Sequence, residues 1–233
     1  MIELELPTTE SYRAFLEANP AEWSILDKLC RVTISRFYRD VSVFDFLDQE
    51  VLPQLAKRVI DTGETLRCWS AGCASGEEPY TLELIFKHRL DPKFPQLRRE
   101  ILATDTDPHL LERAQKACYP TGCLKNLPGE LMTSFVKRGG QCCLEQALRY
   151  EVTFSQQDIR TELPRGPFHL ILCRNLVLTY FSTALQQRVL AGIIERLAPQ
   201  GVLVFGKGEA LPENVGGVVP LEESLNVFLK PGR

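Results

Sequence analysis

The fold is decided by the stretch Leu66-Arg67-Cys68-Trp69-Ser70-Ala71-Gly72-Cys73-Ala74-Ser75-Gly76. A short apolar run passes here into a turn of small residues, and residues 77–88 then read as a helix with apolar side chains available for burial. Strand, glycine turn and helix in this order form the unit from which parallel sheets are built. Because open α/β sheets bind ligands at the carboxyl ends of their strands, we expect a ligand site at this turn.

Three further apolar segments repeat the strand pattern, at 101–105, 168–173 and 201–206. Helical segments separate them: Pro108 opens one after the second strand, and residues 182–197 are strongly amphipathic. This alternation predicts an α/β fold with a doubly wound, Rossmann-like parallel sheet. Val218-Val219 and residues 225–229 predict a closing hairpin.

We expect two parts along the chain, an N-terminal helical segment at 1–60 and a ligand-binding domain at 61–233. Thr8-Thr9-Glu10 can cap a first helix, which Asn19-Pro20 ends. Apolar residues then line a second helix near Trp23 and Leu29 and a third between 44 and 59. Gly139-Gly140, followed by two alternating segments, predicts a small antiparallel β insertion at about 139–154.

Composition excludes several classes of protein. The chain has 233 residues, of which 44% are hydrophobic and 24% charged, and its net charge is −3. This balance is that of a globular domain, and the charge is a poor match for nucleic acid. Apolar runs are too short to span a bilayer, and the first residues do not resemble a signal peptide. We expect a soluble, cytoplasmic protein with no membrane insertion; the sequence leaves its oligomeric state open.

The eight cysteines are scattered, and none forms a Cys-x-x-Cys pair. The cysteines and histidines do not show the tight spacing that a zinc site needs, so we expect no metal site. Reduced thiols are the default in the cytoplasm, and the sequence therefore predicts eight free cysteines.

Two positions point to a nucleoside ligand. Gly72 lets the backbone approach a ligand, although neither Gly-x-Gly-x-x-Gly nor a Gly-Lys-Ser/Thr phosphate loop is present. Asp105, at the end of the second strand, can accept hydrogen bonds from a ribose diol, while Asp107 before Pro108 is better placed to cap a helix. A nucleoside without a diphosphate, such as S-adenosylmethionine, fits this combination; a tight turn that binds nothing is the alternative.

Residues 68–81 closely resemble the signature of the chemotaxis receptor methyltransferases (the CheR type), which methylate protein glutamate using S-adenosylmethionine. Three further blocks match that family in order across roughly residues 20 to 230. They are Ser35-Arg36-Phe37-Tyr38-Arg39-Asp40, residues 101–107, and Phe168-His169-Leu170-Ile171-Leu172-Cys173-Arg174-Asn175 leading to Tyr180-Phe181.

The resemblance implies a role for each matching residue. Together with Gly72 from the turn, the expected cofactor-binding set is Ser35, Arg39, Gly72, Glu78, Asp105, Asp158, Ile159, Arg174 and Asn175. Within it, Glu78 would reach the methionine end, Asp105 the ribose, and Asp158 with Ile159 the adenine. Arg39 and Tyr180 form the expected catalytic pair.

These residue types suit methyl transfer to a carboxylate. Transfer from a sulfonium is an in-line displacement, and an ionised carboxylate needs positioning and desolvation rather than a general base. Arg39 can hold such a carboxylate through two parallel hydrogen bonds, and Tyr180 can place an electron-rich ring near the sulfonium.

The sequence departs from the family in three ways. Residues 1–45 carry a net charge of −3, the wrong sign for docking onto an acidic receptor. Thr33 replaces a usual Asn, and four residues instead of three separate Asn175 from Tyr180. The leading hypothesis is transfer to protein glutamate. Transfer to a small carboxylic acid or other metabolite, and a non-catalytic S-adenosylmethionine-binding module, remain alternatives, although the intact polar set argues against the last.

Overall fold

The computed structural model describes residues 6, 8–19, 21–22, 26, 35–212 and 214–232, and residue contacts divide the chain into two compact units, Met1–Ile34 and Ser35–Arg233. In the first unit, α1 (Thr9–Ala18) begins at Thr8, whose side chain and that of Ser11 each accept a hydrogen bond from the other's backbone N–H. This capping box confirms the first expected helix. The second expected helix, near Trp23 and Leu29, lies outside the described residues apart from Leu26.

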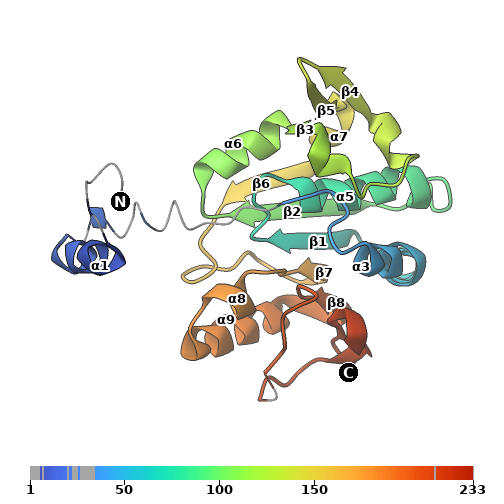
Figure 1. Ribbon diagram of the computed structural model, residues 1–233. Helices are drawn as coiled ribbons and strands as arrows, with labels where there is room; N and C mark the ends of the chain where they lie inside the picture. The colour runs from blue at the N-terminus through green and yellow to red at the C-terminus, as the bar shows by residue number, and fades with distance from the viewer. Residues whose placement is uncertain are drawn as a thin grey trace. The chain divides into compact units, whose positions relative to one another are not determined.

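The second unit is built on a seven-stranded sheet with the order β6-β2-β1-β7-β8-β10-β9 (Figure 1). The first five strands in this order are parallel, and β10 and β9 add an antiparallel hairpin. The doubly wound sheet and its closing hairpin are thereby confirmed. The strands are β1 (Leu66–Ala71), β2 (Arg99–Asp105), β6 (Val152–Gln156), β7 (Phe168–Leu172), β8 (Leu197–Val204), β9 (Val219–Glu222) and β10 (Val227–Leu229), with the 3-10 turn η5 (Glu223–Leu225) between the last two.

Helices cover both faces of this sheet, and for that reason the central strands are apolar on both sides. Cys68 and Leu170 join the core on one face, whereas Trp69 and Ile171 join the core on the other. On the first face lie α3 (Val41–Phe46), η1 (Leu47–Val51), α4 (Leu52–Thr62), α5 (Glu77–Ile85), η2 (Phe86–Leu90) and α6 (Pro108–Lys116). On the second face lie α8 (Val177–Tyr180) and α9 (Thr183–Arg196). Among the described residues, no helix is long and apolar enough to cross a membrane.

The helix expected between 44 and 59 is confirmed, and it shares the core of the sheet. Its α3 and α4 parts are joined by the π-helical turn η1, and Pro53 stands two residues after that turn, at the second position of α4. Gly63 ends the helix with a left-handed φ of +70°. Residues 41–62 therefore belong to the compact unit that begins at Ser35.

A small antiparallel sheet with the order β3-β5-β4 stands at the top of the view in Figure 1. Its strands are β3 (Cys118–Pro120), β4 (Phe135–Arg138) and β5 (Gln141–Leu144), with the turns η3 (Thr121–Leu124) and η4 (Leu131–Ser134) before β4 and α7 (Gln146–Arg149) after β5. Gly139 and Gly140 form the expected tight turn, both with positive φ. The sheet thus spans 118–144 rather than 139–154, because Val152–Gln156 pairs with β2 as the edge strand of the large sheet.

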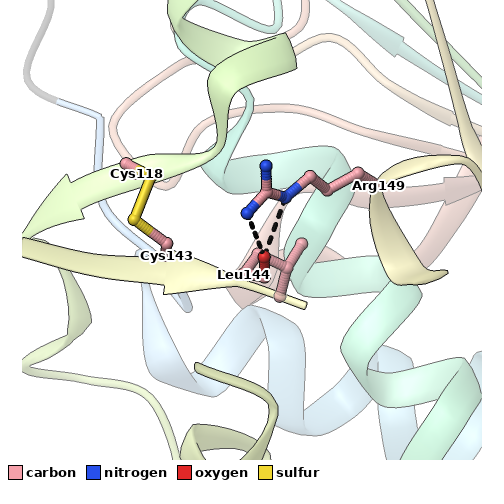
Figure 2. Close-up of a disulfide and its surroundings, with 4 residues drawn as sticks. All are labelled: Cys118, Cys143, Leu144 and Arg149. Carbon is pink, nitrogen blue, oxygen red and sulfur yellow. Dashed lines mark hydrogen bonds between the residues drawn. A yellow bond between two sulfur atoms is a disulfide. The ribbon is translucent and has the colours of Figure 1, made fainter. Parts of the chain in front are cut away.

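Two cysteines of the small sheet are joined, which corrects the prediction of eight free thiols. Cys118 on β3 and Cys143 on β5 are directly opposite, with Cα atoms 4.0 Å apart, and form a disulfide (Figure 2). Opposite residues of antiparallel strands come close enough for this bond, so the pairing follows from the strand register. Beside it, Arg149 donates two hydrogen bonds to the backbone oxygen of Leu144, which fixes the end of β5 (Figure 2).

Candidate active site

The segments that leave the carboxyl ends of the parallel strands carry most of the expected site residues. Gly72 follows β1, Asp105 ends β2, Asp158 lies just beyond β6, and Arg174 with Asn175 follows β7. Since parallel strands end at one edge of a sheet, the topology brings these residues together.

The glycine turn is fixed to the neighbouring strand. The N–H groups of Gly72 and Cys73 both donate to the backbone oxygen of Thr104, at 2.8 and 2.9 Å. Gly72 has a left-handed φ of +75°, and a Cβ atom there would lie 2.6 Å from a methyl carbon of Leu176. Glycine is thus required here by backbone conformation and by the side chain of Leu176, a reason different from the ligand contact that the sequence suggested.

Asp105 holds this turn from the side of β2. One carboxylate oxygen accepts a hydrogen bond from the N–H of Ala74 at 2.9 Å, and the other accepts from the N–H of Asp107 at 3.0 Å. Each oxygen keeps a further lone pair, so the carboxylate can still accept from a diol. Asp107 caps α6 by accepting from the N–H of His109, as expected.

A buried guanidinium connects three parts of the site. Arg174 donates to Glu78 at 3.1 Å, to the Asp40 carboxylate at 2.5 Å and to the backbone oxygen of Arg39 at 3.0 Å. Its side chain is 2% exposed and lies over the ring of Phe44. Within the described part of the chain, its Nε atom is buried without a hydrogen-bond partner, which leaves one donor available in this cluster.

Glu78 completes this cluster from the start of α5. The hydroxyl of Ser70, at the end of β1, donates to its Oε1 atom at 2.7 Å, while its Oε2 atom accepts from Arg174. The carboxylate is thereby oriented by two donors from neighbouring strand ends. Ser70 and Asp40 were missed as site residues, although both belong to blocks that the sequence analysis quoted.

The segment 35–40 packs against α5 and η3. Phe37 is fully buried, and its N–H donates to the backbone oxygen of Cys123 at 3.0 Å. The N–H of Tyr38 donates to the hydroxyl of Thr81 on α5. Ser35 and the side chain of Arg39 are half-buried on this segment, so the fold brings both expected residues to the unit that contains the sheet.

The expected adenine-flanking residues lie beyond β6. The N–H of Gln157 donates to the backbone oxygen of Asp105 at 3.0 Å, which brings the segment to the end of β2. Ile159 is buried, and the Asp158 carboxylate forms an ion pair with Arg160 at 2.7 Å. Asp158 is therefore already held by a cation at the edge of the site.

The loop after β7 is organised by a residue that the sequence analysis did not single out. The N–H of Asn175 donates to the Glu209 carboxylate at 2.8 Å, and the hydroxyl of Thr179 donates to its other oxygen at 2.7 Å. Tyr180 ends α8 with a side chain that is 60% exposed. No local motif marks Glu209, because Asn175 and Thr179 lie 30 or more residues earlier in the sequence.

Two thiols next to the site are unsuited to nucleophilic chemistry. Burial raises the pKa of the Cys73 thiol well above its ordinary value and raises the pKa of Cys173 in the same way. Because the thiolate is the reactive species, both cysteines act as small apolar groups.

Fold and site together define a class: an α/β protein that presents a glycine turn, an acid after the second strand and an Arg–carboxylate cluster at the ends of its strands. Residues 33–224 match the family model described as the CheR methyltransferase, SAM binding domain. The chain belongs to the CheR methyltransferase family. It is an S-adenosylmethionine-dependent methyltransferase.

Individual relatives agree with this assignment. The chain is 30% identical over 218 residues to chemotaxis protein methyltransferase 2 of Vibrio cholerae serotype O1, covering 89% of this chain and 74% of that protein. It is 33% identical over 184 residues to the chemotaxis protein methyltransferase of Listeria monocytogenes serovar 1/2a, covering 78% and 67%. Among solved structures, the N-methyltransferase NodS of Bradyrhizobium japonicum WM9 overlaps 76% of this chain and 64% of its own, with 16% identity and a TM-score of 0.41, a similarity too weak to carry a conclusion.

Proposed function

We propose that this enzyme transfers the methyl group of S-adenosylmethionine to the side-chain carboxylate of a glutamate in a protein. The observation that carries this proposal is the buried Arg174 cluster with Asp40 and Glu78, beside Asp105 and the glycine turn. The relatives named as chemotaxis protein methyltransferases support a protein acceptor.

The polar groups of the site fit the cofactor. The spare lone pairs of Asp105 suit a ribose diol, and Glu78 suits a methionine ammonium group. The unpaired Nε of Arg174 is a donor of the kind that a carboxylate accepts. We assign the cofactor to the set Ser35, Arg39, Gly72, Glu78, Asp105, Asp158, Ile159, Arg174 and Asn175.

The bound cofactor supplies an electrophilic methyl group on a sulfonium. For the acceptor, we propose that the Arg39 guanidinium holds the carboxylate by two hydrogen bonds and orients it for in-line attack. No proton has to be removed, since a carboxylate is ionised at neutral pH. Arg39 and Tyr180 are the proposed catalytic pair.

The exposure of Tyr180 supports a macromolecular acceptor. Its side chain is 60% exposed at the end of α8, so a glutamate on the surface of another protein can reach it. The net charge of −3 supports a partner other than nucleic acid. The proposed location is the cytoplasm, a compartment in which the Cys118–Cys143 disulfide is unusual.

The test uses the full chain, S-adenosylmethionine labelled in the methyl group, and bacterial lysate separated afterwards into protein and small-molecule fractions. Carboxyl methyl esters hydrolyse in base and release methanol, so we expect label in the protein fraction that base converts to a volatile product. Label in small molecules, or base-stable label in protein, would contradict the proposed acceptor. Cofactor binding by calorimetry without any transfer would contradict the proposed transfer in this lysate. Asp105→Ala serves as the control for transfer that depends on the site.

A further inference from the structure

The Glu209 side chain is a buried carboxylate with three hydrogen-bond donors. The residue is 8% exposed and follows β8 in a turn in which its N–H donates to the backbone oxygen of Gly206. Its Oε2 atom accepts from the N–H groups of Asn175 and Gly206, at 2.8 and 2.7 Å, and its Oε1 atom accepts from the hydroxyl of Thr179 at 2.7 Å.

These contacts join the ends of two neighbouring strands. The ladder between β7 and β8 continues to the hydrogen bond from Cys173 N–H to the Val204 oxygen, at 2.9 Å. Beyond it, the next donors from each side, Asn175 and Gly206, both bind the same oxygen of Glu209. Removing the carboxylate would leave two backbone N–H groups without this acceptor, which is costly where the site is buried.

The same carboxylate fixes the loop after β7 at two points. Asn175 is left-handed, with φ +52°, and a Cβ atom on Gly206 would lie 2.6 Å from its side-chain oxygen. On either side of Asn175, Arg174 reaches Asp40 and Glu78, and Leu176 lies against Gly72. An Asn175 backbone held in this conformation therefore directs Arg174 to Asp40 and Glu78, and Leu176 to the glycine turn.

We infer that Glu209 is a positioning residue for methyl transfer: its two oxygens hold the loop 174–180 so that Arg174 stays in the cofactor site and Tyr180 at its edge. The inference rests on the proposed role of Arg174, and Glu209 acts through the loop. The property that matters is the pair of acceptor oxygens.

Two substitutions of Glu209 distinguish the effect of its acceptor oxygens on the loop from the effect of its negative charge. Glu209→Ala removes both acceptors, and we expect S-adenosylmethionine to bind about tenfold more weakly and turnover to fall about 10²-fold. Glu209→Gln keeps one oxygen for the two N–H groups and can donate its amide to the Thr179 hydroxyl, so affinity should stay within about threefold of wild type. Calorimetry gives the affinity, and thermal unfolding gives the folded fraction.

A matched carboxylate away from the site controls for stability. Glu83 on α5 is 1% exposed and pairs with Arg99 at 2.7 Å, where β2 begins and far from its carboxyl end. Glu83→Gln should lower the melting temperature and leave cofactor affinity per folded molecule unchanged. Thr179→Val removes only the Oε1 contact, keeps the two backbone bonds and should weaken binding by a few-fold, which covers the case in which Glu209→Ala does not fold.

A double-mutant cycle with Arg174→Lys tests whether Glu209 influences cofactor affinity through Arg174. If Glu209 acts through the loop, Glu209→Ala should cost much less affinity in the Arg174→Lys background than in wild type. Three results would overturn the inference. The first is a loss of cofactor affinity in the double variant that equals the sum of the two single losses, and the second is unchanged affinity and turnover in folded Glu209→Ala. The third is a Glu209→Gln variant that is as defective as Glu209→Ala at the same melting temperature. Unchanged affinity in Arg174→Lys alone would contradict the proposed role of Arg174, while the Glu209 variants would still decide whether the carboxylate positions the loop.

Discussion

The phenol of Tyr119 donates a hydrogen bond to the backbone oxygen of Ser75 over 2.8 Å. Its ring is buried and meets the ring of Phe37 edge to face, with centroids 4.9 Å apart. Tyr119 lies on β3, so the first strand of the small sheet contacts both the glycine turn and the segment 35–40. The small sheet therefore supports the proposed cofactor site from outside the large sheet.

Asp105→Ala should weaken the binding of S-adenosylmethionine by about 1–3 kcal/mol, because the ribose hydroxyls lose a charged hydrogen-bond acceptor. Calorimetric titration measures this loss. The matched control is Asp107→Ala, which removes the cap of α6 and should cost about 1 kcal/mol of stability without changing affinity. Equal affinity in wild type and Asp105→Ala would contradict the ribose assignment.

Gly72→Ala should destabilise the fold more than Gly63→Ala does. Both glycines are left-handed, at φ +75° and +70°, but a Cβ on Gly72 meets Leu176 whereas Gly63 has open space around it. Urea unfolding of the two variants isolates the steric part of the cost, since the backbone penalty of about 1–2 kcal/mol is shared. Adding Leu176→Ala to Gly72→Ala should recover part of the extra loss of stability at Gly72. Equal losses of stability in Gly72→Ala and Gly63→Ala would contradict a clash between the new Cβ and Leu176.

Arg39→Lys should lower turnover by about 10²-fold, because lysine keeps the charge but cannot form two parallel hydrogen bonds with a carboxylate. Cofactor affinity should fall much less. Steady-state kinetics and calorimetry on the same variant separate the two effects. Near-normal turnover would exclude the carboxylate-holding role, and equal losses in both would make Arg39 a cofactor residue only.

Reduction of the denatured protein should expose two further reactive thiols, because Cys118 and Cys143 form a disulfide. Mass spectrometry of peptides should find these two joined. Without reductant, Cys118→Ser should give one more reactive thiol than the wild-type chain, since Cys143 is then released. Eight thiols in the wild-type chain would show that the bond is not formed.

The free energy of unfolding should fall as the pH drops below 6.5, partly through His169. Burial lowers the pKa of His169 below its ordinary value of 6.5, and the hydrogen bond to Glu64 opposes this shift. The unfolded chain therefore binds the proton more readily, and stability that is fully present above pH 6.5 is lost as the pH falls towards the folded pKa. Urea midpoints between pH 7.5 and 5 should fall less steeply for His169→Asn; parallel curves would contradict this role.

Much of the fold follows from local patterns. The central strands are continuous apolar runs between turn residues, and Pro108 opens a helix where expected. Val152–Gln156 was assigned wrongly for a physical reason: it is an edge strand in which Val152 alone is buried, so apolar and polar residues alternate in it as in a strand of an antiparallel hairpin.

The candidate site was predictable where one segment carries the chemistry. The glycine turn, Asp105 and Arg174 follow strands, so their meeting at one sheet edge could be expected. The Cys118–Cys143 bond depends on the register of β3 against β5, which two separate turns determine. Two of the donors to Glu209 are the backbone N–H groups of Asn175 and Gly206. Any residue type can supply a backbone N–H, so no sequence pattern predicts these contacts.

The residues of the candidate site lie far apart in the sequence, so they leave the ribosome at different times. Arg174 pairs with Asp40, which lies 134 residues earlier, and the N–H of Asn175 donates to Glu209, which lies 34 residues later. β7 lies next to β1 in the sheet, although a hundred residues separate them in the chain. A nascent chain that has not yet released residue 209 from the exit tunnel therefore lacks the anchor of this loop, and we expect cofactor capture only after Glu209 has emerged.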